Sequence, residues 1–231
     1  MIVDFHSHIL PSVDHGSTGI DQSLSQIRLV GKTADRVVAT SHFYPHVHNL
    51  EGFISKVDAA AAELKSAIAD ISAPEVCLGA EVLLCEYLDH LDGIEKLCIR
   101  GTRCMLLEMP DVGAWSDRLI GTVESLMSKD IVIVLAHIDR YVREYEADID
   151  RLLSMGVLAQ INASALMPFF SRRRLMPYLH SGAVCALGSD LHGVDEEACR
   201  DFATVEAKIG TELYQKIMSK SKKLLLGAEL L

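Results

Sequence analysis

The sequence contains 231 residues, of which 49% are hydrophobic and 23% are charged, and its formal net charge is -10. This balance is typical of a globular protein with a full core, and the length suits one domain over residues 1–231. The acidic charge and the lack of a long basic block argue against nucleic acid as a partner, because a phosphate backbone selects clustered Lys and Arg.

The chain begins Met1-Ile2-Val3-Asp4, without a basic segment before an apolar stretch, so the sequence predicts no secretory signal. The longest apolar runs, such as 131–136, are far shorter than a membrane span, and no membrane insertion is expected. The six cysteines are scattered through apolar segments without a CxxC pair. We interpret them as reduced core residues of a cytoplasmic protein.

Short β-rich runs alternate with amphipathic runs along the chain. The predicted strands are Ile2–His6, Arg36–Thr40, Val76–Glu81, Met105–Glu108, Ile131–Ala136, Val157–Ile161 and Ala183–Leu187. The predicted helices are Asp21–Gly31, Leu50–Ala69, Ser116–Ser128, Glu144–Met155, Arg173–His180, Glu196–Ile209 and Thr211–Leu231. Such βα repeats predict a parallel sheet closed into a distorted (β/α)7 TIM-like barrel, one repeat short of the usual eight. The apolar C-terminal end is expected to pack on the barrel or on a second copy, which leaves a homo-oligomer open.

Side chains of the kinds that bind metals stand at the ends of these strands, where a parallel barrel builds its active site. In chain order they are His6, His8, His42, Glu81, Glu108, His137, Asp190 and His192. A single His or Glu at a strand end is usually a loop residue bonded to backbone. So many converging carboxylates and imidazoles would be costly to bury without cations between them. Nitrogen and oxygen ligands without Cys suit Mn, Fe or Zn in a polynuclear site.

The opening motif Asp4-Phe5-His6-Ser7-His8 puts two imidazoles on one side of an extended strand, and Asp14-His15-Gly16 follows in a loop. With further stretches in order, the chain resembles the polymerase and histidinol phosphatase (PHP) family. Within it, the chain is most similar to the bacterial manganese-dependent protein-tyrosine phosphatases of capsule and exopolysaccharide synthesis. The further stretches are Ala39–His46, Gly79–Glu81, Leu107–Glu108, Ala136–Tyr141 and Gly188–His192.

The resemblance implies the PHP fold and a site for three ions, Mn²⁺ with Fe or Zn as alternatives. It assigns His6, His8, Glu81 and Asp190 to one ion, Glu81, Glu108 and His137 to a second, and Asp14, His42 and His192 to a third. It also implies hydrolysis of a phosphomonoester by a metal-activated hydroxide, with Asp190 and His192 among the catalytic residues. Arg140 is the candidate phosphate clamp, and its alternative role is a surface ion pair.

The implied substrate is a phosphotyrosyl protein, the tyrosine kinase of exopolysaccharide synthesis, and the alternative is histidinol phosphate or another small phosphate monoester. A non-catalytic, metal-stabilised regulatory domain is the alternative of another class. Two departures bear on these expectations. The family often has Asp-Asp-Gly at Asp14-His15-Gly16, so His15 competes with Asp14 as a ligand. The second phosphate-binding Arg usually follows the final Asp-x-His closely, whereas the first Arg here is Arg200, predicted on the next helix.

Overall fold

Parallel strands form the centre of the computed structural model, which describes residues 1–111 and 115–231. They are hydrogen-bonded in the order β7-β6-β5-β4-β3-β2-β1-β8, so neighbours in the sequence are neighbours in the sheet, except that the short β8 pairs with β1. Their bounds are β1 Val3–His8, β2 Arg36–Phe43, β3 Glu75–Leu83, β4 Cys104–Glu108, β5 Val132–Leu135, β6 Leu158–Asn162, β7 Val184–Gly188 and β8 Leu191–His192.

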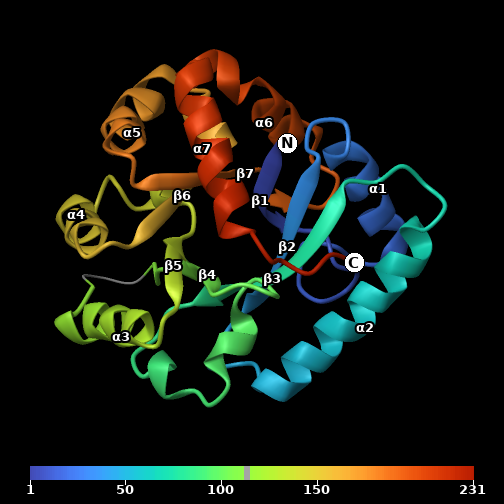
Figure 1. Ribbon diagram of the computed structural model, residues 1–231, viewed down its shortest axis with the longest axis horizontal. Helices are drawn as coiled ribbons and strands as arrows, with labels where there is room; N and C mark the ends of the chain where they lie inside the picture. The colour runs from blue at the N-terminus through green and yellow to red at the C-terminus, as the bar shows by residue number, and fades with distance from the viewer. Residues whose placement is uncertain (112–114) are drawn as a thin grey trace.

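Helices surround these strands on the outside (Figure 1). The α-helices are α1 Ile20–Val30, α2 Leu50–Ile68, α3 Asp117–Ser128, α4 Glu146–Ser154, α5 Phe169–Ser181, α6 Glu196–Ile209 and α7 Thr211–Leu224. Short 3₁₀ turns are η1 Leu88–His90, η2 Ile94–Leu97, η3 Ile138–Arg140 and η4 Ala163–Leu166. The apolar faces of the helices and the outward side chains of the strands make one large core cluster.

Local sequence signals fix several helix ends. The side chain of Asn49 accepts a hydrogen bond from the Gly52 amide at the start of α2, and Asp195 accepts from the amides of Glu197 and Ala198 at the start of α6. Such caps satisfy amides that have no partner within their own helix. Gly182 ends α5 in the left-handed conformation, with φ 82°, which suits a residue without a Cβ.

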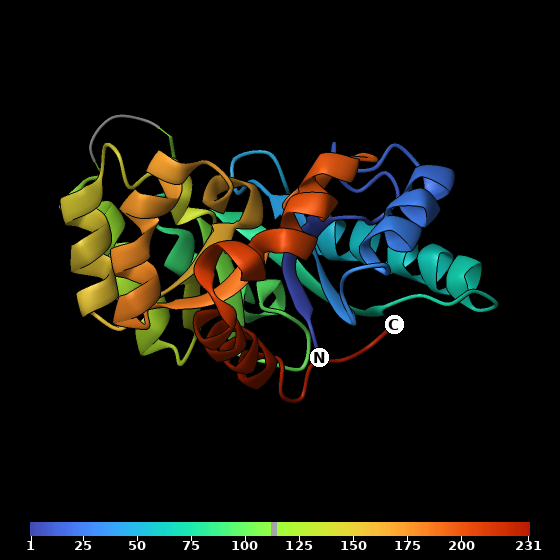
Figure 2. The ribbon, with the colours of Figure 1, turned by 90° about the horizontal axis from the view of Figure 1, so that it is seen from above.

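A second, smaller set of buried apolar side chains fills one end of the barrel, and we call it the inner apolar cluster. Its members are Val3, Phe5, Val38, Cys77, Ile99, Cys104, Leu106, Val134, Ala136, Cys185, Ala186 and Leu225. The C-terminal segment closes this end: α7 crosses in front of the strands in Figure 1, and Leu230 forms an antiparallel bridge with Cys77. Figure 2 shows both chain termini on this side of the molecule. The apolar end of the chain therefore packs on its own barrel.

An irregularity in β1 changes which side chains face the interior. Asp4 pairs with Val37 but Ser7 pairs with Ala39, so three steps along β1 match two along β2. As a result Phe5 joins the inner apolar cluster while its neighbour His6 reaches Glu81, also inside the barrel. A bulge of this kind re-aims side chains near active sites. Here it turns both histidines of the opening motif toward the mouth.

The strand pattern read from the sequence is confirmed, with boundaries within three residues of the prediction. The structure adds β8, which follows β7 without an intervening helix and pairs with β1. Helix α5 begins at Phe169, four residues before the predicted start, and α7 ends at Leu224. All six cysteines are free thiols. Among the described residues, no helix combines the length and the apolar character needed to cross a membrane.

Candidate metal centre

Glu81, near the end of β3, is fully buried, and its carboxylate lies among imidazoles from three parts of the barrel. Its Oε2 is 3.1 Å from His6 Nε2 and 3.2 Å from His8 Nε2, both on β1. The same oxygen is 3.0 Å from Nδ1 of His42 on β2. Its Oε1 is 2.7 Å from Nε2 of His137, just past β5. One carboxylate therefore joins ligand-type groups that are far apart in the sequence.

Two more carboxylates complete this centre. Asp190 Oδ1 lies 3.4 Å from His6 Nε2 and 3.6 Å from His8 Nε2. Glu108 Oε1, at the end of β4, lies 3.7 Å from His137 Nε2. We call the whole set the ligand cluster, and its members are His6, His8, His42, Glu81, Glu108, His137, Asp190 and His192.

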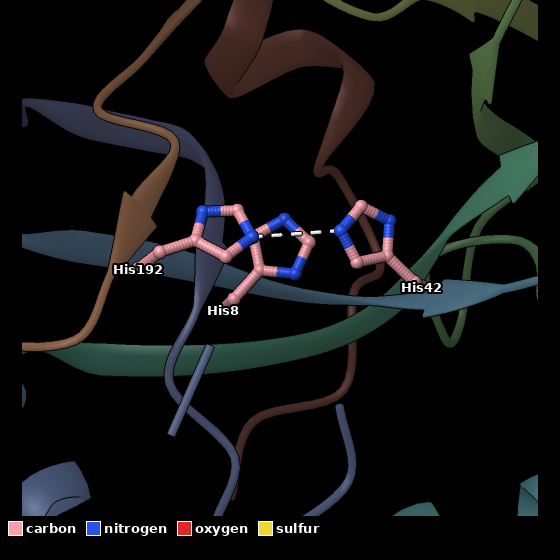
Figure 3. A group of neighbouring side chains, drawn as sticks. All are labelled: His8, His42 and His192. Carbon is pink, nitrogen blue, oxygen red and sulfur yellow. Dashed lines mark hydrogen bonds between the residues drawn. The ribbon is translucent and has the colours of Figure 1, made fainter. Parts of the chain in front are cut away.

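His192 brings the last short strand to the cluster. Its Nε2 lies 3.4 Å from Nε2 of His42, and Figure 3 shows these two nitrogens directed at each other across the ring of His8. The His192 ring also stacks on the His8 ring with centroids 4.0 Å apart. Pairing of β8 with β1, in which His8 stands opposite His192, produces this contact.

Two cluster residues sit in strained backbone. His137 has φ 31° and Asp190 has φ 53°, and neither is glycine. Residues with a Cβ rarely adopt positive φ, and such conformations concentrate at functional sites where the surroundings hold them in place. Both residues lie two positions past a strand end, where this turn of the backbone directs their side chains into the mouth.

Gln160, on β6, contacts residues of the ligand cluster, and the sequence pattern did not predict it. Its Oε1 accepts a hydrogen bond from the His137 amide at 2.5 Å and lies 3.3 Å from His6 Nδ1. Its Nε2 donates to Asn162 Oδ1 at 2.9 Å, and Asn162 Nδ2 donates to Asp190 Oδ2 at 2.9 Å. Outer partners of this kind fix the tautomer and the orientation of metal-binding side chains. The alternation along β6, which points both residues inward, is the signal that could have found them.

Charge and proton balance in the cluster depend on the imidazoles. Burial lowers the pKa of His8, but hydrogen bonds to Asp14 and Glu81 outweigh it and raise the pKa to about 10. Burial raises the pKa of Glu81, but the imidazoles of His6 and His137 outweigh it and hold that pKa well below its usual range. Protons on imidazoles thus compensate the carboxylates here. Divalent cations would displace those protons and take over the same role.

The pKa of the Glu108 carboxylate and that of the His192 imidazole shift in opposite directions. Burial and the nearby charge of Glu81 raise the pKa of Glu108. Burial and the charge of His8 lower the pKa of His192 to about 4, so that this imidazole is neutral and has a free lone pair at pH 7. Neutral imidazole is the form that binds a metal.

The donor set fits divalent cations. Three groups of side chains place one ligand atom each within 4.8 Å of the others, and these are His6-His8-Glu81, His42-Glu81-Glu108 and His8-His42-His192. The donors are nitrogen and oxygen, and His42 Nδ1 is buried beside Glu81 without a hydrogen bond. A cation between the His42 nitrogen and the Glu81 carboxylate would bind a lone pair of each. Sites that combine imidazole with carboxylate suit Zn, Fe or Mn. The predicted division of ligands among three ions stays a prediction.

Asp14, one of the nine predicted ligands, lies behind the ring of His8, outside the ligand cluster. Its Oδ2 is 2.8 Å from His8 Nδ1, the nitrogen that faces away from Glu81.

Arg140, at the end of η3, forms an ion pair with Asp190 and brings Nη1 to 3.3 Å from His137 Nε2, while half of its side chain is exposed. It therefore stands at the mouth of the cluster.

The sequence matches a known protein family over almost its whole length. The family model for capsular polysaccharide synthesis, CpsB/CapC, matches residues 2–227. The chain belongs to the CpsB/CapC family. This confirms the resemblance inferred from the motifs at the strand ends.

Two relatives of this CpsB/CapC member match over most of their length. The tyrosine-protein phosphatase CpsB of Streptococcus agalactiae is 26% identical over 230 residues, which cover 89% of this chain and 93% of that protein. The tyrosine-protein phosphatase YwqE of Bacillus subtilis is 25% identical over 240 residues, which cover 97% of this chain and 91% of that protein.

A solved structure confirms the predicted barrel fold. It comes from crystal structures of YwqE from Bacillus subtilis and CpsB from Streptococcus pneumoniae, described as unique metal-dependent tyrosine phosphatases. The two folds agree with a TM-score of 0.83 at 21% sequence identity, and the match covers 100% of this chain and 96% of that one.

A cavity of about 470 Å³ opens beside the ligand cluster of this CpsB/CapC member. Its lining includes Arg140 and Asp190, and also Asp195, Glu197 and Asp201 from the α6 region. Arg200 lies on the same helix, but it is directed at Glu197, 3.6 Å away, and its side chain is 65% exposed. Arg200 thus makes a surface ion pair in this structure.

Proposed function

We propose that this CpsB/CapC family member is a metal-dependent phosphatase that removes phosphate from phosphotyrosyl protein. The observation that carries the proposal is the convergence of five imidazoles and three carboxylates at one mouth of the barrel, because divalent cations bound there would offset the buried carboxylates and neutralise phosphate oxygens. The relatives named tyrosine-protein phosphatases support the choice of substrate.

The proposal assigns the nine predicted ligands to three ions, with Mn²⁺ first and Fe or Zn as alternatives. Bound cations supply two things in such sites: they acidify a coordinated water, and they neutralise the charge of the phosphate oxygens. Glu81 is suited to link two ions because its two oxygens face different imidazoles, Oε2 toward His6 and Oε1 toward His137. Gln160 contacts the imidazole of His6 and accepts a hydrogen bond from the backbone amide of His137, so it helps to position both residues.

Arg140 is the proposed phosphate-binding residue. It lies at the edge of the cluster, half exposed, with its guanidinium on the carboxylate of Asp190. A phosphate oxygen that enters the mouth can accept a hydrogen bond from the Arg140 guanidinium, because the planar fork of Arg can bind two oxygens at once. Asp190 would hold a cation through Oδ1, which faces His6 and His8, while Oδ2 contacts Arg140.

A second candidate substrate is a small phosphate monoester that carries a positive charge, such as histidinol phosphate. The acidic wall formed by Asp195, Glu197 and Asp201 favours it, because these carboxylates line the same cavity as Arg140. An ammonium or imidazolium group on the substrate would be attracted to this wall while its phosphate meets the cluster. The same wall favours Lys or Arg beside the tyrosine in a protein substrate.

The test is metal add-back with matched substrates. The purified protein is stripped with a chelator and supplied with Mn²⁺, and phosphate release is measured from a phosphotyrosyl peptide with flanking Lys and from histidinol phosphate. We expect Mn²⁺-dependent release with a higher kcat/KM for the peptide. Preference for histidinol phosphate would establish the second candidate instead, and no metal-dependent release from either would overturn both.

Two matched variants belong to the same experiment. Arg140→Ala should raise KM for the peptide by about 10- to 100-fold, the worth of a charge-assisted hydrogen bond, with metal content unchanged. Arg200→Ala, on α6, is the control and should behave like the parent. Equal effects of the two substitutions would contradict the proposed role of Arg140.

A further inference from the structure

The loop that carries Asp14, His15 and Gly16 is tightly fixed over the end of β1. A Cβ on Gly16 would lie 2.0 Å from His8 Cβ, so only glycine allows the chain to pass this close. The Gly16 carbonyl accepts hydrogen bonds from the Gly193 amide at 2.6 Å and from Gln26 Nε2 at 3.1 Å. The position of the neighbouring side chains is therefore set by the fold.

Asp14 points from this loop into the protein. Its Oδ1 accepts a hydrogen bond from the Gly16 amide at 2.8 Å, and its Oδ2 accepts one from the His42 amide at 2.9 Å. The same Oδ2 lies 2.8 Å from His8 Nδ1. Both oxygens are engaged, and the contact with His8 leaves Nε2 of that ring to face Glu81. This is the position of a carboxylate that orients a metal-binding imidazole.

His15 points the other way, toward the mouth. Its ring centroid lies 4.8 Å from that of His42 and 4.7 Å from that of His192, and 6.4 Å from that of His8. His15 is exposed and its ring stacks on both neighbours, so a rotation about its side-chain torsions would direct a nitrogen at the gap between His42 and His192. Nε2 atoms of those two rings already lie 3.4 Å apart.

We infer that His15, with His42 and His192, holds the outermost cation of this site, and that Asp14 is a positioning residue for His8. The inference rests on the proposed metal-dependent function and reassigns one of its ligands. A set of three imidazoles brings no negative charge to its cation. It therefore favours ions that prefer imidazole, such as Zn²⁺ or Fe²⁺, over Mn²⁺, which prefers oxygen.

Metal content tests the inference without any measurement of turnover. Stripped parent protein and the variants His15→Ala, Asp14→Asn and His46→Ala are saturated with Zn²⁺ and desalted, and bound zinc per chain is determined by mass spectrometry. His46 is an exposed histidine near the mouth and outside the ligand cluster, so it serves as the control. Circular dichroism checks that each variant is folded.

We expect His15→Ala to bind one zinc fewer than the parent, and His15→Asp to recover it because a carboxylate can replace an imidazole as ligand. Asp14→Asn should keep the full number but bind about 10- to 100-fold more weakly, the usual effect of losing an outer partner. His46→Ala should match the parent.

Full zinc content in His15→Ala, or loss of a whole equivalent in Asp14→Asn, would overturn the inference while leaving the proposed function intact. A parent protein that binds no zinc and no Mn²⁺ would instead overturn the proposed function, and the inference with it. The two failures are therefore distinguishable.

Discussion

The two ends of the barrel interior are built from the same strands and have opposite chemistry. One end holds the inner apolar cluster, closed by Leu225 and the C-terminal segment, and the other holds the ligand cluster. On β4, Leu106 belongs to the first and Glu108, two residues later, to the second. On β2, Val38 belongs to the inner apolar cluster and His42 to the ligand cluster, with Thr40 between them on the same side of the strand.

This contrast shows how the fold can carry a costly site. Carboxylates that converge repel each other and lose hydration, and only cations or protonated imidazoles offset that loss. The inner apolar cluster contributes stability at the other end, through burial that depends on no bound ion. We therefore expect substitutions at the two ends to separate metal binding from folding.

Glu81→Gln should have the largest effect on the ligand cluster. The substitution keeps the shape but removes the charge that faces four imidazoles, so we expect loss of bound metal and a fall in phosphatase activity of at least about 10³-fold. The fold should persist, because the inner apolar cluster is untouched. Metal content, activity and far-UV circular dichroism measure the three properties. Retained metal with full activity would show that Glu81 is not the centre of the site.

Leu106→Ala should have the opposite profile. Leu106 is fully buried and stands opposite Glu81 in the register of β3 and β4. Because it lies so near the ligand cluster, it is the most stringent test of whether the two ends can be separated. Removing a buried leucine side chain costs about 2–5 kcal/mol of stability. Denaturant unfolding of the metal-free protein should show this loss, while the metal content at saturation stays that of the parent. A loss of metal without a loss of stability would contradict the separation of the two ends.

Much of this contrast could be predicted from the sequence. The alternation of apolar strands and amphipathic helices is strong enough to give the barrel, and the strand ends give the ligand cluster, because parallel strands bring their ends to one mouth. His6 and His8 were predicted correctly as a pair on one side of β1.

Other features depend on register and on backbone conformation, which the sequence pattern does not reveal. The bulge in β1 places Phe5 and His6 both inside the barrel, although simple alternation would separate them. The left-handed conformation of His137 aims its side chain inward from a position that alternation along β5 would point outward. β8 is only two residues long, and its pairing with β1 is set by tertiary structure.

Gly188 lies where the two ends meet, and a small change there should affect both weakly. A Cβ at this position would lie 2.6 Å from His6 Cβ and 2.7 Å from Gln160 Nε2, so Gly188→Ala must displace one or both. We expect a loss of about 1–3 kcal/mol from overpacking, and weaker metal binding because His6 and its outer partner move together.

The matched control for this substitution is Gly121→Ala in α3, where an added Cβ would meet nothing within 4 Å. It should be neutral or stabilise the protein by up to about 1 kcal/mol, because alanine is favoured over glycine inside a helix. Chemical unfolding and zinc titration of both variants measure the difference. If Gly188→Ala lost stability but bound metal like the parent, His6 would have to tolerate a shift of its Cβ. The ligand cluster would then be less dependent on the packing beneath it than its buried position implies.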